Sequence, residues 1–189
     1  MPRLILASAS PRRLELLRQI GVVPDRVEPS LIDESIRRHE LPGAHAARLA
    51  DAKARAVAAA FPADFVLAAD TVVACGRRIL PKALDEATAR SCLALLSGRR
   101  HRVIGGVTLI APSGRSAARL VTTSVTMKRL EAGEIDAYLA EGEWHDKAGG
   151  YAIQGLAAAF VRQLSGSYSN VVGLPLYETA ALLSGLGYR

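Results

Sequence analysis

The chain has 189 residues, of which 50% are hydrophobic and 22% are charged, a composition typical of a globular protein and not of a disordered one. No apolar run approaches the roughly 18 residues that span a bilayer, and the N-terminus lacks the regions of a signal peptide. Only 5% of the residues are aromatic and no basic run forms an arm, so the net charge of +6 suits a small polyphosphate as well as a nucleic acid. Cys75 and Cys92 share no metal-ligand spacing. We therefore expect a cytoplasmic protein with reduced, buried thiols and with neither a membrane nor a nucleic-acid partner.

The first predicted elements are a strand at 3–8 and a helix at 11–20, joined by a turn of small residues. Ser10 is a suitable N-cap for this helix. Arg12 and Arg13 then fall in its first turn, where the positive end of the helix dipole disfavours cations. A bound anion that is not part of the chain would resolve this conflict. The free N–H groups, a serine hydroxyl and two guanidiniums together form a phosphate-sized site for it.

The rest of the first half continues to alternate between strand and helix. A polar segment containing proline covers 28–43, and an alanine-rich helix follows at 44–60. A buried-type strand at 64–76 is expected to have a polar break at Asp70-Thr71. A helix at 84–98 carries acidic residues in its first turn and ends at a glycine.

The second half is richer in strand signals. Two long β-branched segments are separated by Pro-Ser-Gly, which predicts a hairpin. A helix, a glycine-bearing loop, a strand, a second loop and a final helix should follow, at 131–142, 144–155, 157–166, 167–175 and 175–184. This mixture predicts an α/β protein with a twisted mixed sheet, flanking helices and two lobes around a central cleft.

Asp70 interrupts the apolar run FVLAADTVVA, and two interpretations are open. An aspartate at a strand end commonly makes turn hydrogen bonds. Alternatively, it is a carboxylate at the carboxyl end of a sheet strand, where ligand sites of α/β proteins usually lie. In that case the neighbouring Thr71 can bond a base edge or a metal-bound water.

The chain has only four lysines but twenty arginines, which suggests a bias that has replaced most lysines by arginine. Each remaining lysine is therefore a candidate for a role that needs a compact point charge. Lys53 is either a solvated cation on its helix or a functional one. Lys82 is either a loop cation or a phosphate ligand near a helix start. Lys147 is expected to form a weak local ion pair with Asp146, and Lys128 is assigned to the surface.

The segment AGGYAIQG at 148–155 is expected to be a tight loop whose glycines let backbone N–H groups approach a ligand. It ends near Gln154, whose amide offers both a donor and an acceptor and so can read a nucleobase edge. An ordinary turn with a polar tip is the alternative. Glu34 and Asp70 are the candidate ligands for a divalent cation, with Asp33 as a less favoured neighbour. The chain has no Walker, Rossmann, HExxH, CxxC or nucleophile-elbow pattern, which argues against those sites.

Taken together, these motifs resemble the Maf family of nucleoside triphosphate pyrophosphatases over nearly the whole chain. The resemblance is carried by LASASPRRLELL, RLADAKA, AADTVV, the Lys82 loop with LLSG and His101 after it, DKAGGYAIQG and GSYSNVVGLPL. It implies one domain over residues 1–189, a fold related to the inosine triphosphate pyrophosphatases, and a homodimer. It also implies cleavage between the α and β phosphates, with Mg²⁺ or Mn²⁺ as cofactor and Asp70 as proton acceptor.

The same resemblance makes Arg12, Thr71 and Gln154 the specificity positions, in the forms of the branch that acts on dTTP and UTP. One departure concerns Lys82, because family members usually have Lys-Pro where this chain has Pro81-Lys82-Ala83.

The residues then fit one hypothetical mechanism. Ser10 and Arg13 hold phosphate oxygens, and Lys53 and Lys82 neutralise charge on the leaving pyrophosphate. Asp70 orients and deprotonates the attacking water. Two rivals remain: a nucleotide-binding regulator of cell division that does not need catalysis, and a nucleic-acid binder that uses the basic surface.

Overall fold

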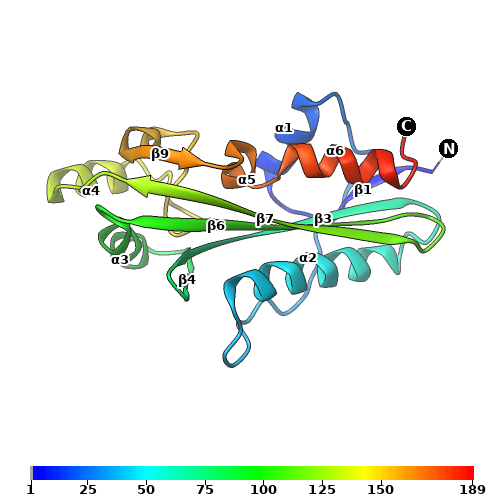
Figure 1. Cartoon of the computed structure of the whole chain (residues 1–189), viewed down its shortest axis with the longest axis horizontal. Coiled ribbons are helices and arrows are strands. Elements are labelled where there is room, and N and C mark those ends of the chain that lie inside the picture. Colours follow the sequence, from blue (N-terminus) through cyan, green and yellow to red (C-terminus); the bar gives the residue numbers. More distant parts are fainter. Residues whose placement is uncertain (1) are drawn as a thin grey trace.

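A long, twisted sheet of seven strands organises the computed structural model, which describes residues 2–189 (Figure 1). Six strands lie in the order β2-β1-β3-β6-β7-β9, and β4 pairs with β3 off this path. The bounds are β1 Leu4–Leu6, β2 Arg26–Val27, β3 Phe65–Cys75, β4 Arg78–Leu80, β6 Arg100–Ile110, β7 Ser116–Met127 and β9 Val161–Ser165. β1 is parallel to β2 and β3, whereas the other pairs are antiparallel, so the predicted mixed sheet is confirmed.

Helices cover both faces of this sheet (Figure 1). One face is covered by α2 (Pro42–Ala58), and the other by α1 (Pro11–Gln19) and α6 (Leu176–Gly185). The alternation along β3 explains this division, because Leu67 packs in the cluster with α1 and α6 while Val66 packs against α2. Further helices are α3 Glu86–Leu96, α4 Ala132–Ala140, α5 Tyr168–Val172 and the 3₁₀ helix η1 Leu156–Phe160.

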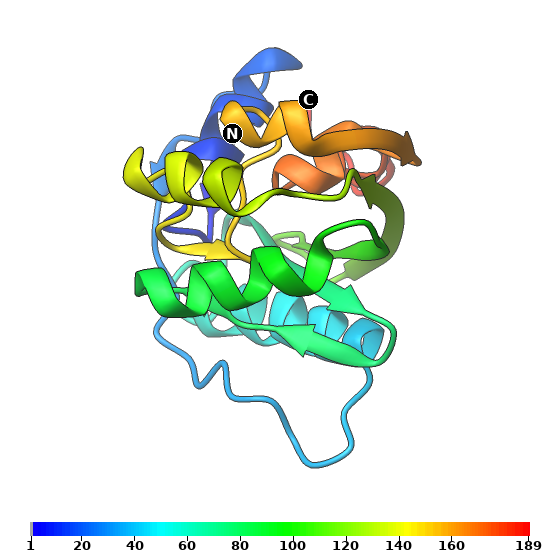
Figure 2. The same cartoon turned by 90° about the vertical axis from the view of Figure 1, so that its left-hand side faces the viewer.

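The molecule has two large hydrophobic cores at opposite ends of the long strands. One core packs α1 and α6 on the sheet, and the other packs α3 and α4 around the far ends of β3, β6 and β7 (Figure 2). Because these three strands contribute to both cores, they connect the two predicted lobes. The segment between β2 and α2 projects from this body (Figures 1 and 2).

The sheet has an opening along one side of β3. β1 pairs there with residues 65–67, and β4 pairs with residues 73–75. Within the described chain, no strand pairs with residues 68–72 on that side. The chain turns away from β1 into α1 and from β4 into β5 (Lys82–Ala83), so both turns border this opening.

Three sequence expectations about local structure are wrong. No break occurs at Asp70-Thr71, because β6 pairs with β3 throughout and distant cations bond both polar side chains. The expected loop at 167–175 contains α5, which begins where the Ser167 side chain accepts a hydrogen bond from the Asn170 N–H. The glycine-bearing loop contains a short strand, β8 (Lys147–Ala148), paired with β5.

Of the remaining predicted elements, the strand expected at 157–166 begins only at Val161, because residues 156–160 form η1. The others are confirmed to within a few residues, including the hairpin of β6 and β7. Cys75 and Cys92 are both unpaired, and Cys92 is buried whereas Cys75 is half-buried. Within residues 2–189, no helix combines the length and apolar character needed to cross a membrane.

Candidate active site

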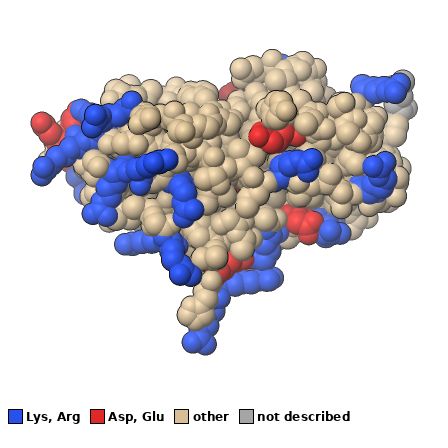
Figure 3. Space-filling model, viewed as in Figure 1, with Lys and Arg blue, Asp and Glu red and all other residues tan. Residues whose placement is uncertain are grey.

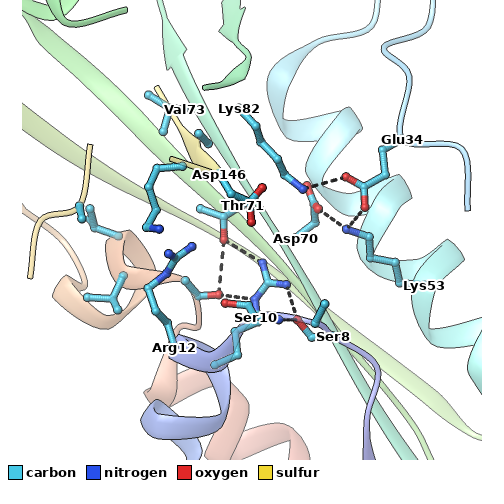
Figure 4. A pocket seen from close by; sticks show the side chains of 18 of the residues that line it. Ser8, Ser10, Arg12, Glu34, Lys53, Asp70, Thr71, Val73, Lys82 and Asp146 are labelled. Atoms are coloured by element: carbon cyan, nitrogen blue, oxygen red, sulfur yellow. Dashed lines mark hydrogen bonds and ion pairs between the residues drawn. The ribbon is translucent and has the colours of Figure 1, made fainter. Parts of the chain in front are cut away.

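A cleft lies at the opening beside β3, where segments from seven parts of the chain converge (Figure 4). Five of them are the turn after β1, the projecting segment, the middle of β3, the loop around β8 and the end of α5, and α2 and β5 add Lys53 and Lys82. Every site residue predicted from the sequence lines it: Ser10, Arg12, Arg13, Glu34, Lys53, Asp70, Thr71, Lys82 and Gln154. The less favoured Asp33 does not line it; its carboxylate bonds Ser35.

A chain of charges on the α2 side of β3 joins three of these residues to Asp70. Lys53 Nζ lies 2.7 Å from Asp70 Oδ1 and 2.7 Å from Glu34 Oε1. Lys82 Nζ lies 3.2 Å from Glu34 Oε2. Lys53 and Asp70 are each only 6% exposed, so Lys53 is not the solvated helix cation that one interpretation allowed. A buried ammonium holding a buried carboxylate at an open cleft is an arrangement suited to acid–base chemistry.

Glu34 differs from Asp70 in that its side chain remains 38% exposed. Burial raises the pKa of Glu34, but hydrogen bonds and charge from Lys53 and Lys82 outweigh this effect, so the pKa lies below its usual 4.5. Glu34 is therefore ionised at neutral pH and shares two lysines that a phosphate can also bind.

A different set of contacts holds Arg13 on the α1 and α5 side of β3. Its guanidinium donates from Nε to Gly173 O (2.9 Å), from Nη1 to Ser8 Oγ (2.9 Å) and from Nη2 to Thr71 Oγ1 (3.2 Å). Burial lowers the pKa of Arg13, and the negative charge of Asp70 opposes that change. Within residues 2–189, no carboxylate forms an ion pair with Arg13. A buried cation held only by neutral groups is an environment that favours a bound anion.

Ser10 occupies the predicted N-cap position of α1, but its side chain makes no capping hydrogen bond. Ser10 lines the cleft, where a serine hydroxyl can accept a hydrogen bond from a ligand or donate one to it. Sequence reasoning missed Ser8, whose Oγ accepts bonds from both Arg13 and the Ser10 backbone N–H. Only its place in the same small-residue turn pointed to it.

Two glycines in β6 leave room for helices to approach both faces of the sheet at the site. Gly106 is opposite Asp70, and Gly105 is opposite Thr71. A Cβ at Gly106 would lie 2.4 Å from the Ala46 carbonyl oxygen in α2, and one at Gly105 would lie 2.0 Å from Asn170 Oδ1 in α5. Glycine thus allows α2 to approach near enough for Lys53 to reach Asp70. Sequence reasoning placed this pair in a strand without recognising its role.

The loop around β8 corrects the expectation for Lys147. Lys147 Nζ donates to the His145 carbonyl (2.9 Å) and forms no ion pair with Asp146 within the described residues. Burial, and then the nearby charge of Arg12, lower the pKa of Lys147. Asp146 has a backbone φ of +56°, a strained conformation, and its side chain points into the cleft (Figure 4). Both residues line the cleft but were not predicted as site residues.

The Lys82 loop reaches the cleft despite its departure from the usual family pattern. β5 and β8 pair Lys82 with Ala148 and Ala83 with Lys147. The Pro81 carbonyl accepts a hydrogen bond from the Gly149 N–H at 3.0 Å. This ladder fixes the backbone of Lys82, so its ammonium can reach Glu34.

Comparison with known proteins settles the family. The model of the family described as Maf-like protein matches residues 3–186. The chain belongs to the Maf family. A protein of Paramagnetospirillum magneticum named dTTP/UTP pyrophosphatase is 68% identical over 188 residues, covering 100% of this chain and 99% of that protein. One of the same name from Caulobacter vibrioides is 65% identical over 188 residues, covering 100% and 97%. A solved structure of a nucleoside-triphosphatase from Mycobacterium abscessus matches with 18% identity and a TM-score of 0.43, covering 68% of this chain and 74% of that one.

The carboxylates of this Maf chain provide few ligands for a metal. Within residues 2–189, no three His, Cys, Asp or Glu side chains gather closely enough to hold an ion by themselves. Glu34 and Asp70, which share Lys53, offer two carboxylates. This donor set fits Mg²⁺, which is commonly bound by one or two carboxylates together with substrate phosphates.

The surface of the Maf chain is basic in part. Figure 3 shows Lys and Arg gathered over the end that carries α3, α4 and β9, with fewer acidic side chains between them. Arg100 and Arg102 of β6 are exposed there and bond a serine hydroxyl and a backbone carbonyl, respectively. The basic residues that line the cleft are separate from this surface group.

Proposed function

We propose that this Maf protein hydrolyses dTTP and UTP, and modified pyrimidine nucleotides of the same form, to the nucleoside monophosphate and pyrophosphate. The observation that carries the proposal is the buried Lys53–Asp70 pair at the opening of the sheet, facing the buried Arg13. This arrangement supplies a carboxylate for water and cations for phosphate within one cleft. The names of the two relatives support the same substrates.

In the reaction, water adds to phosphorus and the bond between the α and β phosphates breaks. Asp70 accepts the proton of the attacking water, and Lys53 keeps this carboxylate in place. Lys53 and Lys82 also neutralise charge that develops on the departing pyrophosphate, while Ser10 and Arg13 hold phosphate oxygens. Each of these cations lies in the cleft before substrate binds, so little reorganisation is needed.

We further propose that Mg²⁺ or Mn²⁺ acts as the cofactor. Glu34 and Asp70 would hold the ion together with phosphate oxygens, and the ion would supply positive charge to the triphosphate. The exposed Glu34 is the more accessible of the two carboxylates. Its two lysines remain available to phosphate when its carboxylate turns to the ion.

The proposed base selection uses Arg12, Thr71 and Gln154. Arg12 is half-buried, and burial lowers its pKa despite the opposing charge of Asp146. Thr71 is held by Arg13, and Gln154 is exposed at the cleft. A wrong base leaves such polar groups unpaired once the cleft is filled, and this loss is costly.

The test is to incubate the protein with dTTP, UTP or 7-methyl-GTP in Mg²⁺ and to identify the products. We expect pyrophosphate and a monophosphate from the pyrimidine substrates, and we expect Asp70→Asn to reduce turnover by about 100-fold or more. Asp51→Asn is the matched control, because Asp51 lies on α2 with its side chain 44% exposed and, within the described residues, forms an ion pair only with Arg55. Release of orthophosphate alone would exclude cleavage between the α and β phosphates.

The same experiment separates the rivals. Tight nucleotide binding without turnover would favour a regulator of cell division, and salt-sensitive binding to nucleic acid would favour use of the basic surface. We also propose, from the family resemblance, a cytoplasmic homodimer whose chain forms one domain over residues 1–189. Light scattering of the purified protein measures its oligomeric state.

A further inference from the structure

We propose that His101 is a positioning residue for base recognition, which acts through Tyr151 to fix the loop that carries Gln154. This inference rests on the proposed function, because it assigns a role within the same cleft. It concerns a histidine that the reaction itself does not use. His101 lies in β6, beneath the cleft, and not among the residues that line it.

The His101 side chain is almost completely buried, and its Nε2 forms a hydrogen bond with the loop. Only 1% of its surface is exposed, and its Nε2 lies 2.7 Å from the Tyr151 hydroxyl. The two rings also meet edge to face, with centroids 5.5 Å apart. The other ring nitrogen, Nδ1, is buried without a hydrogen-bond partner within the described residues. Keeping an imidazole there is costly, so the Tyr151 contact needs an explanation beyond filling space.

A second buried tyrosine fixes the next residue of the same loop. The Tyr138 hydroxyl accepts a hydrogen bond from the Ala152 backbone N–H at 3.1 Å. Tyr138 is 2% exposed and packs edge to face on Phe160. Two consecutive loop residues are thus held by polar groups from the core, two positions before Gln154.

The loop has two parts that are anchored separately. Before the turn, β8 pairs with β5 and so belongs with Lys82 on the phosphate side of the cleft. The turn itself uses Gly149 and Gly150, with φ of +71° and +69°. After the turn, His101 and Tyr138 hold the part that leads to Gln154. Loss of the His101 contact should therefore affect the base side more than the phosphate side.

The contacts of His101 and Tyr138 with the loop would hold Gln154 in position before a base binds. Gln154 is exposed, so its own contacts do not fix where its amide lies. The backbone before it sets that position, and a fixed amide pays less ordering entropy when a base binds. Tyr151 itself is 6% exposed and lines the cleft, so a shift of its ring also changes the wall that the nucleoside meets.

The experiment uses one ligand for each side of the cleft. Binding of dTMP reports the base side and binding of pyrophosphate reports the phosphate side, both measured by calorimetry in Mg²⁺. For Tyr151→Phe, which removes only the hydroxyl, we expect dTMP affinity to fall about 3- to 10-fold, the range for one buried hydrogen bond. Pyrophosphate affinity should stay within about twofold. The KM for dTTP should rise with little change in kcat.

Two further variants make the result specific. His101→Gln keeps a polar group that can bond Tyr151 and should retain more dTMP affinity than His101→Leu. Tyr177→Phe is the matched control, because Tyr177 is 83% exposed and its hydroxyl makes no hydrogen bond within the described chain. We expect that control to behave as the wild type in both binding measurements.

The outcomes distinguish the inference from the proposed function. If the wild type hydrolyses dTTP but Tyr151→Phe binds dTMP normally, the positioning role is wrong and the function stands. If dTMP and pyrophosphate affinities fall in parallel, the contact supports the fold in general and the proposal is again wrong. A wild type that neither binds dTMP nor hydrolyses dTTP would overturn both.

Discussion

The buried His101 makes the stability of this protein depend on pH between neutral and moderately acidic solution. Burial lowers the pKa of His101 from 6.5 to about 4. Between these two values the unfolded chain binds a proton that the folded protein excludes, so stability falls as the pH falls. A shift of this size corresponds to roughly 3 kcal/mol in total, of which about 2 kcal/mol is lost between pH 7 and pH 5. For a domain of this length, that loss lowers the melting temperature by about 4–8 °C.

The assay is urea unfolding at several pH values from 7 to 5, with the wild type compared with His101→Gln. We expect the slope of unfolding free energy against pH to flatten in this variant, whatever its absolute stability. His145→Gln is the control, because His145 is an exposed histidine on the surface. Parallel slopes for the wild type and His101→Gln would refute the argument, since His101 would then take up its proton within the fold.

Three further predictions test the contacts around the cleft. Lys53→Met leaves the buried Asp70 carboxylate without its cation and should cost about 3–5 kcal/mol of unfolding free energy, part of which Asp70→Asn should restore in the double variant. Gly106→Ala forces a Cβ against a backbone carbonyl of α2, so we expect a loss of about 1–3 kcal/mol and reduced turnover; normal melting would show that α2 moves freely. Hydrogen bonds from Arg48 hold the pKa of Glu40 far below 4.5, so its stabilisation is present above that pH and declines in more acidic solution. Glu40→Gln should be less stable at pH 7 and lose less on acidification, as measured by acid titration of its circular dichroism.

Local patterns predicted most of the fold because they depend on neighbouring residues. The alternation in β6 and β7, with a turn between them, sufficed for the hairpin. The same reasoning failed at Asp70-Thr71, where polarity within an apolar run indicates a break. The strand continues because Lys53 and Arg13, distant in sequence, provide partners for these side chains. A single sequence does not show such contacts.

The sequence indicated which residues lie at the cleft, but it did not indicate their surroundings, because those depend on distant parts of the chain. Each proposed residue lies at the cleft, but its environment was not predictable. Lys53 looks solvated because its helix carries other charges, and it is buried only because β3 lies against that face of α2. His101 gave no chemical signal of its own, since its role depends on Tyr151, fifty residues away in the chain. Motif order pointed to this histidine, whereas only packing indicates what it does.

The opening beside β3 explains how one ligand can meet groups on both faces of a sheet. Asp70 and Thr71 are adjacent, so they point to opposite faces, toward Lys53 and Arg13 respectively. A fully paired strand would separate these groups, but here no strand covers that edge within the described residues. A ligand entering at the edge can therefore contact both sets, which a ligand on one face cannot.

The charges that line this opening point to the size of the anion that it suits. Five cations and three carboxylates border the cleft, which leaves two positive charges uncompensated: Arg12, Arg13, Lys53, Lys82 and Lys147 against Glu34, Asp70 and Asp146. A nucleoside triphosphate with one divalent cation carries a charge of about −2 and so balances this excess. A diphosphate with the same ion carries about −1 and leaves one buried cation uncompensated, which is unfavourable where Arg13 has no carboxylate partner in the described chain. The two arginines at the start of α1 oppose the helix dipole only until the triphosphate binds.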